Sequence, residues 1–504
     1  MNETQTQNAY EEIENIVGTK FVSDSEPIRY SYSMNCDFVL QGIPDMVVKP
    51  KTPEEVSEIL KVANKHNVKV IPRGNGADLT GGAKPIGDGG IILDVTLMNK
   101  ILDVDEKNRV VTVEVGISWS ELCEQLSHVG IGYYTGSTGP ASGFSASIGG
   151  GLSNNSVGGG GAAMYGAVTE QCVGLEIVLP TGEIIDTGAK ANSFRDKPFT
   201  RFGLGADYSG IFLGDVGIHG VKTKASFNLY PLPEYRGYAT YVVEKTKEKI
   251  PVERVTELMT KWQHQRLQLH DFFYYPPGNV QSSINRKISK NLVGKDIDGG
   301  ILYYTTVADT QKQLDYNIER IEKLADEVGF KKLGPTVEEG NLGKWFYEED
   351  GKWQWANGGW GGRYLFSMSC CLKAPTHLLP EYQKMFNEWT QRNFKKMTEI
   401  GAGGGAGCIA FGVYPSYIDV AGGGALMSTI EHREKQQEIW KDLIITQIKT
   451  LGSVHYWMGE IIGRALVDSG ALTEEYYNFM ITLKKALDPN KILSPGKFYL
   501  TDNY

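Results

Sequence analysis

Three glycine-rich segments, each next to a predicted strand, constrain the fold of this chain more than any other feature. They are VIPRGNGADLTGGA (70–83), GSTGPASGFSASIGGGLSNNSVGGGGAAMYG (136–166) and FLGDVGIHGVKTKASFNLYPLP (212–233). The chain has 60 glycines in 504 residues, almost twice the usual share of roughly 7%. Because these glycines follow no collagen period, we expect many backbone positions that need a positive φ or that approach a bound molecule closely.

The remaining composition is that of an ordinary globular protein. Hydrophobic residues make up 41% and charged residues 22% of the chain, and 504 residues suffice for more than one apolar core. A net charge of −9 argues against nucleic acid as a partner, because a phosphate backbone selects a basic surface. No apolar run reaches the length of about 18 residues that spans a bilayer, and the polar N-terminus lacks a signal-peptide pattern. From these two features we expect a soluble, cytoplasmic protein. The six cysteines are scattered and contain no CxxC, so we expect reduced thiols.

The order of predicted elements divides the chain into four parts. Residues 1–43 form a polar lead-in, 44–234 a strand-rich domain that contains all three glycine segments, 235–475 a second domain crowded with aromatic residues, and 476–504 a C-terminal segment. The clearest helix start is at residue 52, where Thr52 can cap the first turn, Pro53 occupies the first helical position and Glu55 follows.

The first glycine segment has the character of an anion site. Gly74, Gly76, Gly81 and Gly82 follow a predicted strand and can expose consecutive backbone N–H groups to one phosphate. The segment lacks the GxxxxGK[ST] pattern of a P-loop, and no helix follows it directly, as the GxGxxG dinucleotide fingerprint requires. A simple glycine turn between strands therefore remains the alternative for this segment taken alone.

The three segments together resemble the FAD-binding domain of the vanillyl-alcohol oxidase / p-cresol methylhydroxylase (PCMH-type) superfamily, which also contains glycolate and D-lactate dehydrogenases. The stretch from PDMVVKPKTPEEV to LTGGA is similar to that family's first subdomain and pyrophosphate loop. ASIGGGLSNN with YGAVTEQCVGLEIVLPTGEII is similar to its second loop and hairpin, and LKKALDPNKILSPGK to its C-terminal tail. The resemblance covers roughly residues 44–233 and 480–500 and is weak between them.

This resemblance implies an α+β fold, with an FAD-binding domain of two α+β subdomains and a separate α+β substrate cap domain. It implies that backbone groups of two loops and one strand hold the cofactor. These FAD-binding residues are Arg73, Gly74, Asn75, Gly76, Ala77, Asp78, Gly139, Ser147, Gly149, Gly150, Ser153, Asn155 and Val221.

The sequence departs from the family at the positions that attach FAD covalently. Members that use the first loop carry a histidine there, whereas residues 73–82 contain none, and residues 139–166 contain neither histidine nor cysteine. We therefore expect noncovalent FAD. Some relatives use a histidine or tyrosine of the cap, which leaves His264, His270 and His432 open as attachment points.

A metal site is not expected. The HGHxGDGN-like signature of the metal-dependent 2-hydroxyacid dehydrogenases is missing, and the eight histidines show no HxH or HxxxH spacing. This absence lowers the weight of a lactate- or glycolate-type activity.

The candidate catalytic residues lie in the cap. In phenol-oxidising relatives, tyrosines and an arginine stabilise a phenolate while hydride passes to flavin N5, and the matching candidates here are Tyr456 and Arg363. His455 and Glu460 are candidates for a base or an orienting group. Trp457 stands where the family has arginine after the tyrosine. In a strand, His455 would face away from Tyr456, whereas in a helix Tyr456 and Glu460 would share a face.

The sequence thus predicts an FAD-dependent oxidase or dehydrogenase that takes a hydride from a small hydroxylated substrate, an aromatic alcohol or alkylphenol. Electrons would pass to oxygen, a quinone or an acceptor protein, and we expect a homodimer or higher homo-oligomer. The alternatives are a 2-hydroxyacid dehydrogenase and a non-catalytic flavin-binding subunit of an electron-transfer complex.

Overall fold

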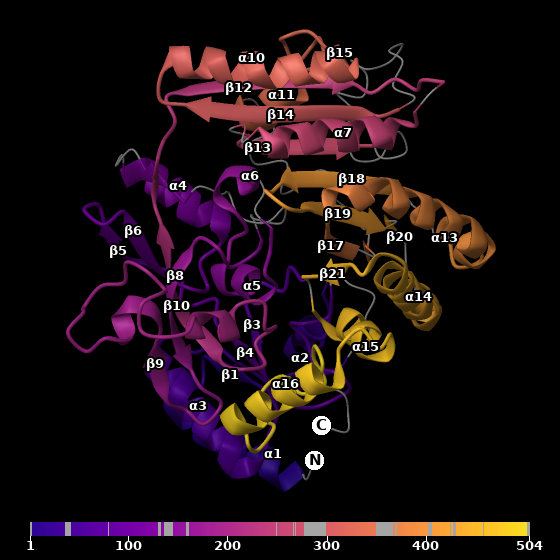
Figure 1. Cartoon of the computed structure of the whole chain (residues 1–504). Helices are drawn as coiled ribbons and strands as arrows, with labels where there is room; N and C mark the ends of the chain where they lie inside the picture. The colour runs from indigo at the N-terminus through magenta and orange to yellow at the C-terminus, as the bar shows by residue number, and fades with distance from the viewer. Residues whose placement is uncertain are drawn as a thin grey trace.

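The computed structural model describes most of the chain as an α+β protein with three main sheets. The residues described are 3–35, 42–78, 80–129, 133–135, 145–157, 161–247, 249–265, 267, 269–276, 299–348, 366–367, 370–401, 406–423, 425–426, 430–456 and 458–500. Two smaller sheets and the helices that cover them form one end of the molecule, and an eight-stranded sheet with its helices forms the other (Figure 1).

The first sheet and its helices contain the N-terminal residues. Its strand order is β1-β2-β4-β3, and α3 lies between β2 and β3 in the chain. The elements are α1 (Glu3–Val17), β1 (Val22–Ser23), α2 (Glu26–Tyr32), β2 (Met46–Val48), α3 (Pro53–His66), β3 (Val70–Arg73) and β4 (Ile91–Asp94). Helix α3 begins as predicted, because Thr52 Oγ1 accepts a hydrogen bond from Glu55 N at 3.2 Å. Apolar side chains of α1, α3 and this sheet continue into the core of the second sheet.

The second sheet carries the other two glycine segments. Its strand order is β5-β6-β10-β8-β9, and its neighbouring strands are all antiparallel. The elements are β5 (Ile101–Asp105), β6 (Val110–Glu114), α4 (Trp119–Val129), α5 (Ile148–Ser153), α6 (Ala162–Tyr165), β8 (Cys172–Val178), β9 (Ile184–Asp186) and β10 (Val221–Asn228). The short strands β7 (Tyr133–Tyr134) and β11 (Tyr230–Pro231) pair with each other. β8 and β9 form the hairpin that the resemblance implied for the segment YGAVTEQCVGLEIVLPTGEII.

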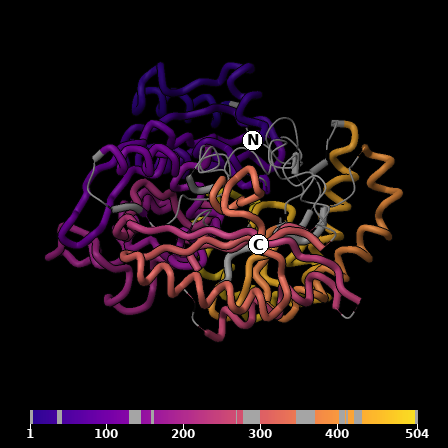
Figure 2. The backbone as a smooth tube through the Cα atoms, turned by 90° about the horizontal axis from the view of Figure 1, so that it is seen from above, coloured from indigo at the N-terminus to yellow at the C-terminus, as the bar shows by residue number. Residues whose placement is uncertain are grey.

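The cap domain is built on the eight-stranded sheet, in the order β15-β12-β14-β13-β18-β19-β17-β21. Its strands are β12 (Tyr235–Val242), β13 (Asp271–Tyr275), β14 (Ile301–Ala308), β15 (Lys331–Lys332), β17 (Cys370–Ala374), β18 (Ala406–Val413), β19 (Ile418–Gly423) and β21 (Val454–His455). Its helices are α7 (Pro251–His264), α10 (Gln311–Val328), α11 (Leu342–Glu348), α13 (Leu379–Glu399) and α14 (Arg433–Leu451). A separate ribbon pairs β16 (Phe366–Ser367) with β20 (Ala425–Leu426). Turned by 90°, the molecule shows the indigo N-terminal segments and the orange helix α13 on different sides (Figure 2).

The two faces of the cap sheet have different neighbours. Phe272 and Tyr274 of β13 pack with the helices α7, α10, α13 and α14 in the main cap core. Phe273 and Tyr275, which alternate with them, belong to a second cluster that includes Val157 of the FAD-binding domain. The cap sheet therefore has one face covered by its own helices and one face turned toward the glycine segments.

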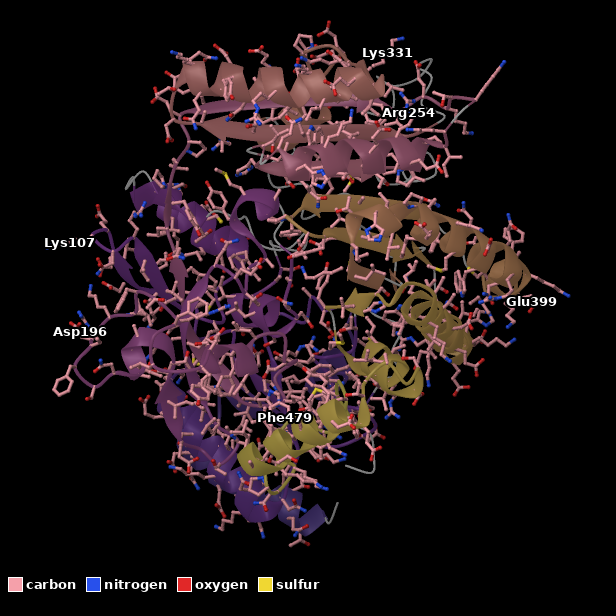
Figure 3. The ribbon with its side chains drawn as sticks, in the orientation of Figure 1. Lys107, Asp196, Arg254, Lys331, Glu399 and Phe479 are labelled. Atoms are coloured by element: carbon pink, nitrogen blue, oxygen red, sulfur yellow. The ribbon has the colours of Figure 1, made fainter. Side chains whose placement is uncertain are left out.

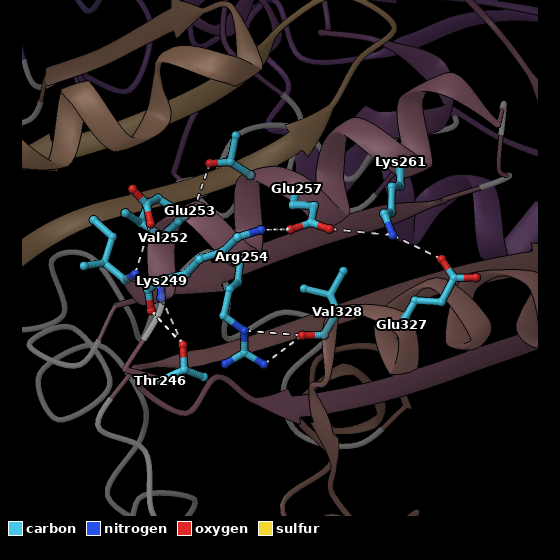
Figure 4. A network of polar contacts seen from close by, with 11 residues as sticks. Thr246, Lys249, Val252, Glu253, Arg254, Glu257, Lys261, Glu327 and Val328 are labelled. Carbon is cyan, nitrogen blue, oxygen red and sulfur yellow. Dashed lines mark hydrogen bonds and ion pairs between the residues drawn. The ribbon is translucent and has the colours of Figure 1, made fainter.

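Arg254 of α7 holds the helix-covered side of the cap together (Figure 4). Its guanidinium donates to the carbonyl oxygens of Val328 at 2.8 Å and Gly329 at 2.6 Å, at the end of α10. It also donates to the carbonyl oxygen of Glu244 at 2.6 Å, after β12. A buried cation at a helix C-terminus satisfies carbonyl groups that have no partner within the helix.

The last two helices leave the cap and return to the first domain. They are α15 (Glu460–Asp468) and α16 (Glu474–Leu487), and Asp488 is the C-cap of α16, directly before Pro489. Phe479 of α16 lies at the end of the molecule opposite Lys331 of the cap (Figure 3). Val70 of β3 forms a parallel bridge with Leu493, so the tail after α16 packs directly on the first sheet.

Candidate functional site

The first glycine loop starts at Arg73, the last residue of β3, and is fastened by that side chain. The Arg73 guanidinium donates from Nη1 to Asn35 Oδ1 at 2.7 Å and to the carbonyl oxygen of Ala83 at 2.9 Å. Gly76 lies directly against it with φ +68°, and a Cβ added there would lie 2.2 Å from Arg73 Nη2. Glycine is therefore favoured at position 76 both by its backbone conformation and by the space that the Arg73 guanidinium fills.

The Asp78 carboxylate bonds to donors of the two glycine loops. Its carboxylate accepts hydrogen bonds from Thr80 N at 3.2 Å, from Thr80 Oγ1 at 2.8 Å and from the backbone N–H of Gly82. It also accepts one from Asn154 Nδ2 at 3.2 Å, which joins the first glycine loop to the second. An acid in this loop is compatible with anion binding because its charge serves donors inside the protein. The predicted exposure of the Gly82 N–H to a phosphate is wrong, because Asp78 accepts its hydrogen bond.

The second glycine segment forms the short helix α5, capped by Ser147. Ser147 Oγ accepts a hydrogen bond from Gly150 N at 3.2 Å, and a Cβ added at Gly74 would lie 2.0 Å from the same oxygen. Gly149 is close to Val115, with its N–H bonded to the Val115 carbonyl oxygen at 2.9 Å. The structure therefore brings Gly74 of the first loop against Ser147 of the second, while Gly149 serves close packing.

The end of α5 contains two asparagines with different roles. Asn155 has φ +48° and its Oδ1 accepts a hydrogen bond from Thr169. Asn154 Oδ1 is buried and has no hydrogen-bond partner among the described residues, whereas its Nδ2 bonds to Asp78. The neighbouring Ser153 uses its carbonyl oxygen to accept from Val216 N at 3.0 Å. An unsatisfied buried amide oxygen at the junction of two loops fits a partner that donates a hydrogen bond, such as a hydroxyl group, and not a phosphate oxygen.

The other predicted FAD residues lie as follows. Asn75 is exposed and Ala77 is partly buried on the first loop. Val221 opens β10, pairs with Val178 and has its side chain in the core, so only its backbone can meet a ligand. Gly139 lies outside the described residues. The close contact of the two glycine loops and the positive φ of Gly76 fit an FAD diphosphate cradle.

A second polar site lies on the cap sheet around Lys373 of β17. We call Lys373, Tyr414, Tyr417, Asp419 and Tyr456 the Lys373 cluster. Lys373 Nζ lies 3.2 Å from Asp419 Oδ1 and 5.1, 4.6 and 5.3 Å from the ring centres of Tyr414, Tyr417 and Tyr456. Tyr414 and Tyr417 stack with ring centres 4.3 Å apart. Three aromatic rings and one carboxylate thus surround a single ammonium group.

Burial shifts the titration of this cluster. Burial raises the pKa of Asp419 to about 6, although Lys373 opposes the shift. Burial also raises the pKa of Tyr456 and of Tyr414 well above the usual tyrosine range, so both phenols remain protonated near neutral pH. Asp419 Oδ2 is buried and has no hydrogen-bond partner in the described part of the chain. The cluster therefore contains a carboxylate oxygen that can accept a proton from a bound group.

The cluster lies on the face of the cap sheet turned toward the second glycine segment. Tyr456 and Tyr414 pack in one apolar group with Val157 and Ala162, which flank the last glycines of that segment. The carboxylate of Glu170, just after α6, acts on the pKa values of Tyr414 and Asp419. The Lys373 cluster and the second glycine segment, which are distant in the sequence, therefore meet at the interface of the two domains.

His455 and Glu460, which were also predicted to be catalytic, make their polar contacts outside the Lys373 cluster. His455 lies in β21 and its Nε2 is 2.9 Å from Gln447 Oε1 of α14, on the helix-covered side. Burial lowers the pKa of His455 to about 4. Glu460 begins α15, its N–H donates to the Thr80 carbonyl oxygen at 3.0 Å, and Arg464 lies 3.9 Å from its carboxylate. Because β21 is a strand and α15 starts only at Glu460, the helical alternative for this segment is wrong.

Two predicted positions cannot be placed, and one histidine lies near the domain interface. Arg363 and Trp457 lie outside the described residues. Of the three histidines kept open for FAD attachment, His270 is buried before β13, with its ring centre 6.0 Å from that of Tyr165 in α6. His264 is exposed at the end of α7, and His432 precedes α14.

Sequence reasoning missed Lys373 and Asp419. The signal available was one charged residue in each of two apolar strands, CCLKA and IDVAGG. A charge inside a buried strand is expensive unless it is paired, so each required a partner. The sequence alone does not indicate that β17 and β19 are neighbouring strands whose register places Lys373 opposite Asp419.

Neither a metal centre nor a membrane-spanning helix is found in the described structure. No three histidine, cysteine, aspartate or glutamate side chains gather there in a way that could hold a metal ion. Among the helices described, none combines the length and apolar character needed to cross a bilayer.

Comparison with known proteins identifies the region that contains the first two glycine segments. Residues 44–188 match the family described as "FAD binding domain". The chain is 33% identical over 229 residues to the glycolate oxidase subunit GlcD of Bacillus subtilis, covering 45% of this chain and 46% of that protein. It is 31% identical over 230 residues to a mitochondrial D-lactate dehydrogenase (cytochrome) of Arabidopsis thaliana, covering 46% of this chain and 38% of that protein. The matched region is thus less than half the length of each of these relatives.

The solved structures resemble the whole chain. Substrate-bound p-cresol methylhydroxylase superposes with a TM-score of 0.83 at 18% identity, covering 100% of this chain and 98% of that one. The 4-ethylphenol oxidase of Gulosibacter chungangensis superposes with a TM-score of 0.81, with the same identity and coverage. The fold is therefore that of a PCMH-type flavoprotein, and residues 44–188 form an FAD-binding domain. The resemblance to the PCMH-type FAD flavoprotein superfamily that the sequence predicted is thus confirmed for the FAD-binding domain by the family match and for the whole chain by the fold.

Proposed function

We propose that this protein is an FAD-dependent oxidoreductase that removes a hydride from a small hydroxylated aromatic substrate, an aromatic alcohol or alkylphenol. The observation that carries the proposal is the Lys373 cluster on the face of the cap turned toward the FAD-binding domain. Such a site offers a cation for an oxygen atom and aromatic rings for a planar substrate.

Each residue of the Lys373 cluster has its own role in the proposed reaction. Lys373 binds the hydroxyl oxygen of the substrate and stabilises the negative charge that develops there. Asp419 accepts the hydroxyl proton at its free Oδ2, so the oxygen keeps the electron pair of the broken O–H bond. Tyr456 donates a hydrogen bond to the same oxygen and, with Tyr414, excludes water. When bound, FAD supplies the acceptor for the hydride that leaves the substrate carbon.

The charge of the cluster favours a phenol or alcohol over a 2-hydroxyacid. Lys373 is already paired with Asp419, so a substrate carboxylate at this ammonium group would lie near a second carboxylate. Two carboxylates this close repel each other, whereas a neutral hydroxyl gains both partners. A 2-hydroxyacid remains the second candidate, because the named sequence relatives are glycolate oxidase and D-lactate dehydrogenases.

Anaerobic bleaching of the bound flavin with a panel of substrates tests the proposal. We expect aromatic alcohols or alkylphenols to reduce the flavin and Lys373→Met to slow this reduction roughly a hundredfold, while Lys331→Met, a change of an exposed cap lysine, leaves it unchanged. Reduction by 2-hydroxyacids alone would support the second candidate. A flavin that stays oxidised with every compound would indicate a non-catalytic flavin subunit.

Admitting air after bleaching identifies the electron acceptor. Rapid reoxidation indicates an oxidase, and slow reoxidation indicates a quinone or an acceptor protein. Noncovalent attachment of FAD, a homo-oligomeric assembly and a cytoplasmic location stay predictions.

A further inference from the structure

The chain's C-terminal segment packs against the first glycine loop. Val70 of β3 donates from N to the Ile492 carbonyl oxygen at 2.8 Å, and Ser494 N donates back to the Val70 carbonyl oxygen at 2.8 Å. These bonds add residues 492–494 beside the strand that leads into the loop. Lys497, three residues later, donates from Nζ to the carbonyl oxygen of Gly81 inside the loop.

Two lysines near the C-terminus are fully buried, and they have different surroundings. Lys484 of α16 bonds to Asp488 and to the carbonyl oxygens of Ile218 at 2.7 Å and Leu493 at 2.9 Å. It therefore belongs to an ion pair within the α16 region. Lys497 has 0% exposure and contacts the loop that cradles the diphosphate. Because burying the charged group of a lysine costs free energy, the position of Lys497 beside the loop indicates a specific role.

The contact of Lys497 fixes the orientation of a peptide group in the loop. In a trans peptide the carbonyl oxygen and the following N–H point in opposite directions. Lys497 holds the carbonyl oxygen of Gly81, and Asp78 holds the N–H of Gly82 at the other side of the same peptide group. The preceding carbonyl oxygen, of Thr80, accepts from Glu460 N at 3.0 Å. Two consecutive loop carbonyls are thus drawn toward α15 and the tail.

The tail adopts an unusual backbone to make this contact. Seven non-glycine residues of the described chain have positive φ, and three of them, Lys491, Ser494 and Phe498, lie within eight residues of each other. Such conformations cost energy and persist where the surroundings impose them, often at ligand clamps.

We propose that Lys497 is an FAD-positioning residue that holds the glycine loop in its diphosphate-binding form and adds positive charge beside it. Docking of the tail and binding of FAD then stabilise each other. This inference rests on FAD binding by the domain and not on the substrate chemistry proposed above, so the two can fail separately.

The test compares FAD affinity and apoprotein stability in four variants. Each is stripped of FAD, titrated with FAD by flavin fluorescence, and melted with and without FAD. We expect Lys497→Met to weaken FAD binding roughly tenfold to a hundredfold, the range for losing one hydrogen bond from a charged group. Lys497→Arg, which keeps the charge and the donor, should recover most of the affinity. Lys485→Met, at an exposed lysine of α16, should equal the parent protein.

Lys484→Met separates positioning from general stability. Its apoprotein should melt at a lower temperature, because Asp488 then lacks its buried partner, but the folded fraction should bind FAD with nearly parental affinity. Equal FAD affinity in Lys497→Met and the parent protein would overturn the proposal. A loss of affinity in Lys484→Met as large as in Lys497→Met would also overturn it.

A measurement on the unaltered protein keeps the proposal testable if Lys497→Met does not fold. FAD should slow amide hydrogen exchange in residues 491–500 more than in α10 of the cap, because the tail bonds directly to the loop. Exchange in residues 491–500 that does not respond to FAD would contradict the coupling.

Discussion

Replacing Gly76 by alanine tests the geometry of the FAD cradle, and Gly87 provides a matched control. The two glycines have nearly the same φ, +68° and +67°. A Cβ added at Gly87 meets nothing within 4 Å, whereas one added at Gly76 would lie 2.2 Å from Arg73 Nη2. Both variants therefore carry the cost of alanine in a left-handed conformation, about 1–2 kcal/mol, and only Gly76→Ala must also displace Arg73.

The additional cost of Gly76→Ala follows from the bonds of that guanidinium. Displacing Arg73 weakens its bonds to Asn35 and to the Ala83 carbonyl oxygen, and one hydrogen bond to a charged group contributes about 1.5–3 kcal/mol. We expect the apoprotein of Gly87→Ala to melt a few degrees below the parent and that of Gly76→Ala clearly lower. FAD affinity should fall at least tenfold in Gly76→Ala and stay unchanged in Gly87→Ala. Equal melting temperatures and equal FAD affinities in the two variants would refute the placement of the cradle at Gly76.

The remaining predictions concern the cap and the cofactor. Tyr456→Phe should lower the rate of flavin reduction roughly a hundredfold with FAD content unchanged, and a parental rate would make Tyr456 a packing residue. Flavin reduction should slow as the pH falls through about 6, where Asp419 takes up a proton, and Asp419→Asn should lack this pH dependence. Because this pKa lies above the ordinary value of 3.8, the stability that Asp419 contributes is present below about pH 4 and is lost as the pH rises through 6. Acid or heat denaturation should release FAD into the supernatant, and yellow colour in the precipitate would contradict noncovalent attachment. Chelators should leave activity intact, whereas loss of activity that a divalent ion restores would favour a metal-dependent 2-hydroxyacid dehydrogenase.

Local chemistry explains which parts of the fold could be predicted from the sequence. The start of α3 is encoded by Thr52, Pro53 and Glu55 within four residues, and the turn between β8 and β9 by adjacent residues. Glycine density marked the loops, because glycine is needed wherever the backbone takes a positive φ or approaches another segment. These signals are local, so no tertiary structure was required to recognise them.

The cap site could not be predicted because it depends on register. Lys373 and Asp419 lie 46 residues apart and face each other only because β17 and β19 are paired at that position. A shift of one residue would turn either side chain to the helix-covered face, where His455 lies. The strand period did predict that His455 and Tyr456 face opposite ways, but it did not choose between strand and helix for that segment.

The first glycine loop shows why the FAD site and the whole fold depend on each other. A loop this rich in glycine loses more conformational freedom on folding than an ordinary loop, so other segments must hold it. The segments that hold the loop come from distant parts of the sequence. Asn35 bonds to Arg73, and Asn154 bonds to Asp78. Glu460 and Lys497 bond to the carbonyl oxygens of two consecutive loop residues, Thr80 and Gly81. The contacts that hold the loop therefore include one that joins residues more than 400 positions apart, and a cofactor bound at the loop would stabilise these contacts as well.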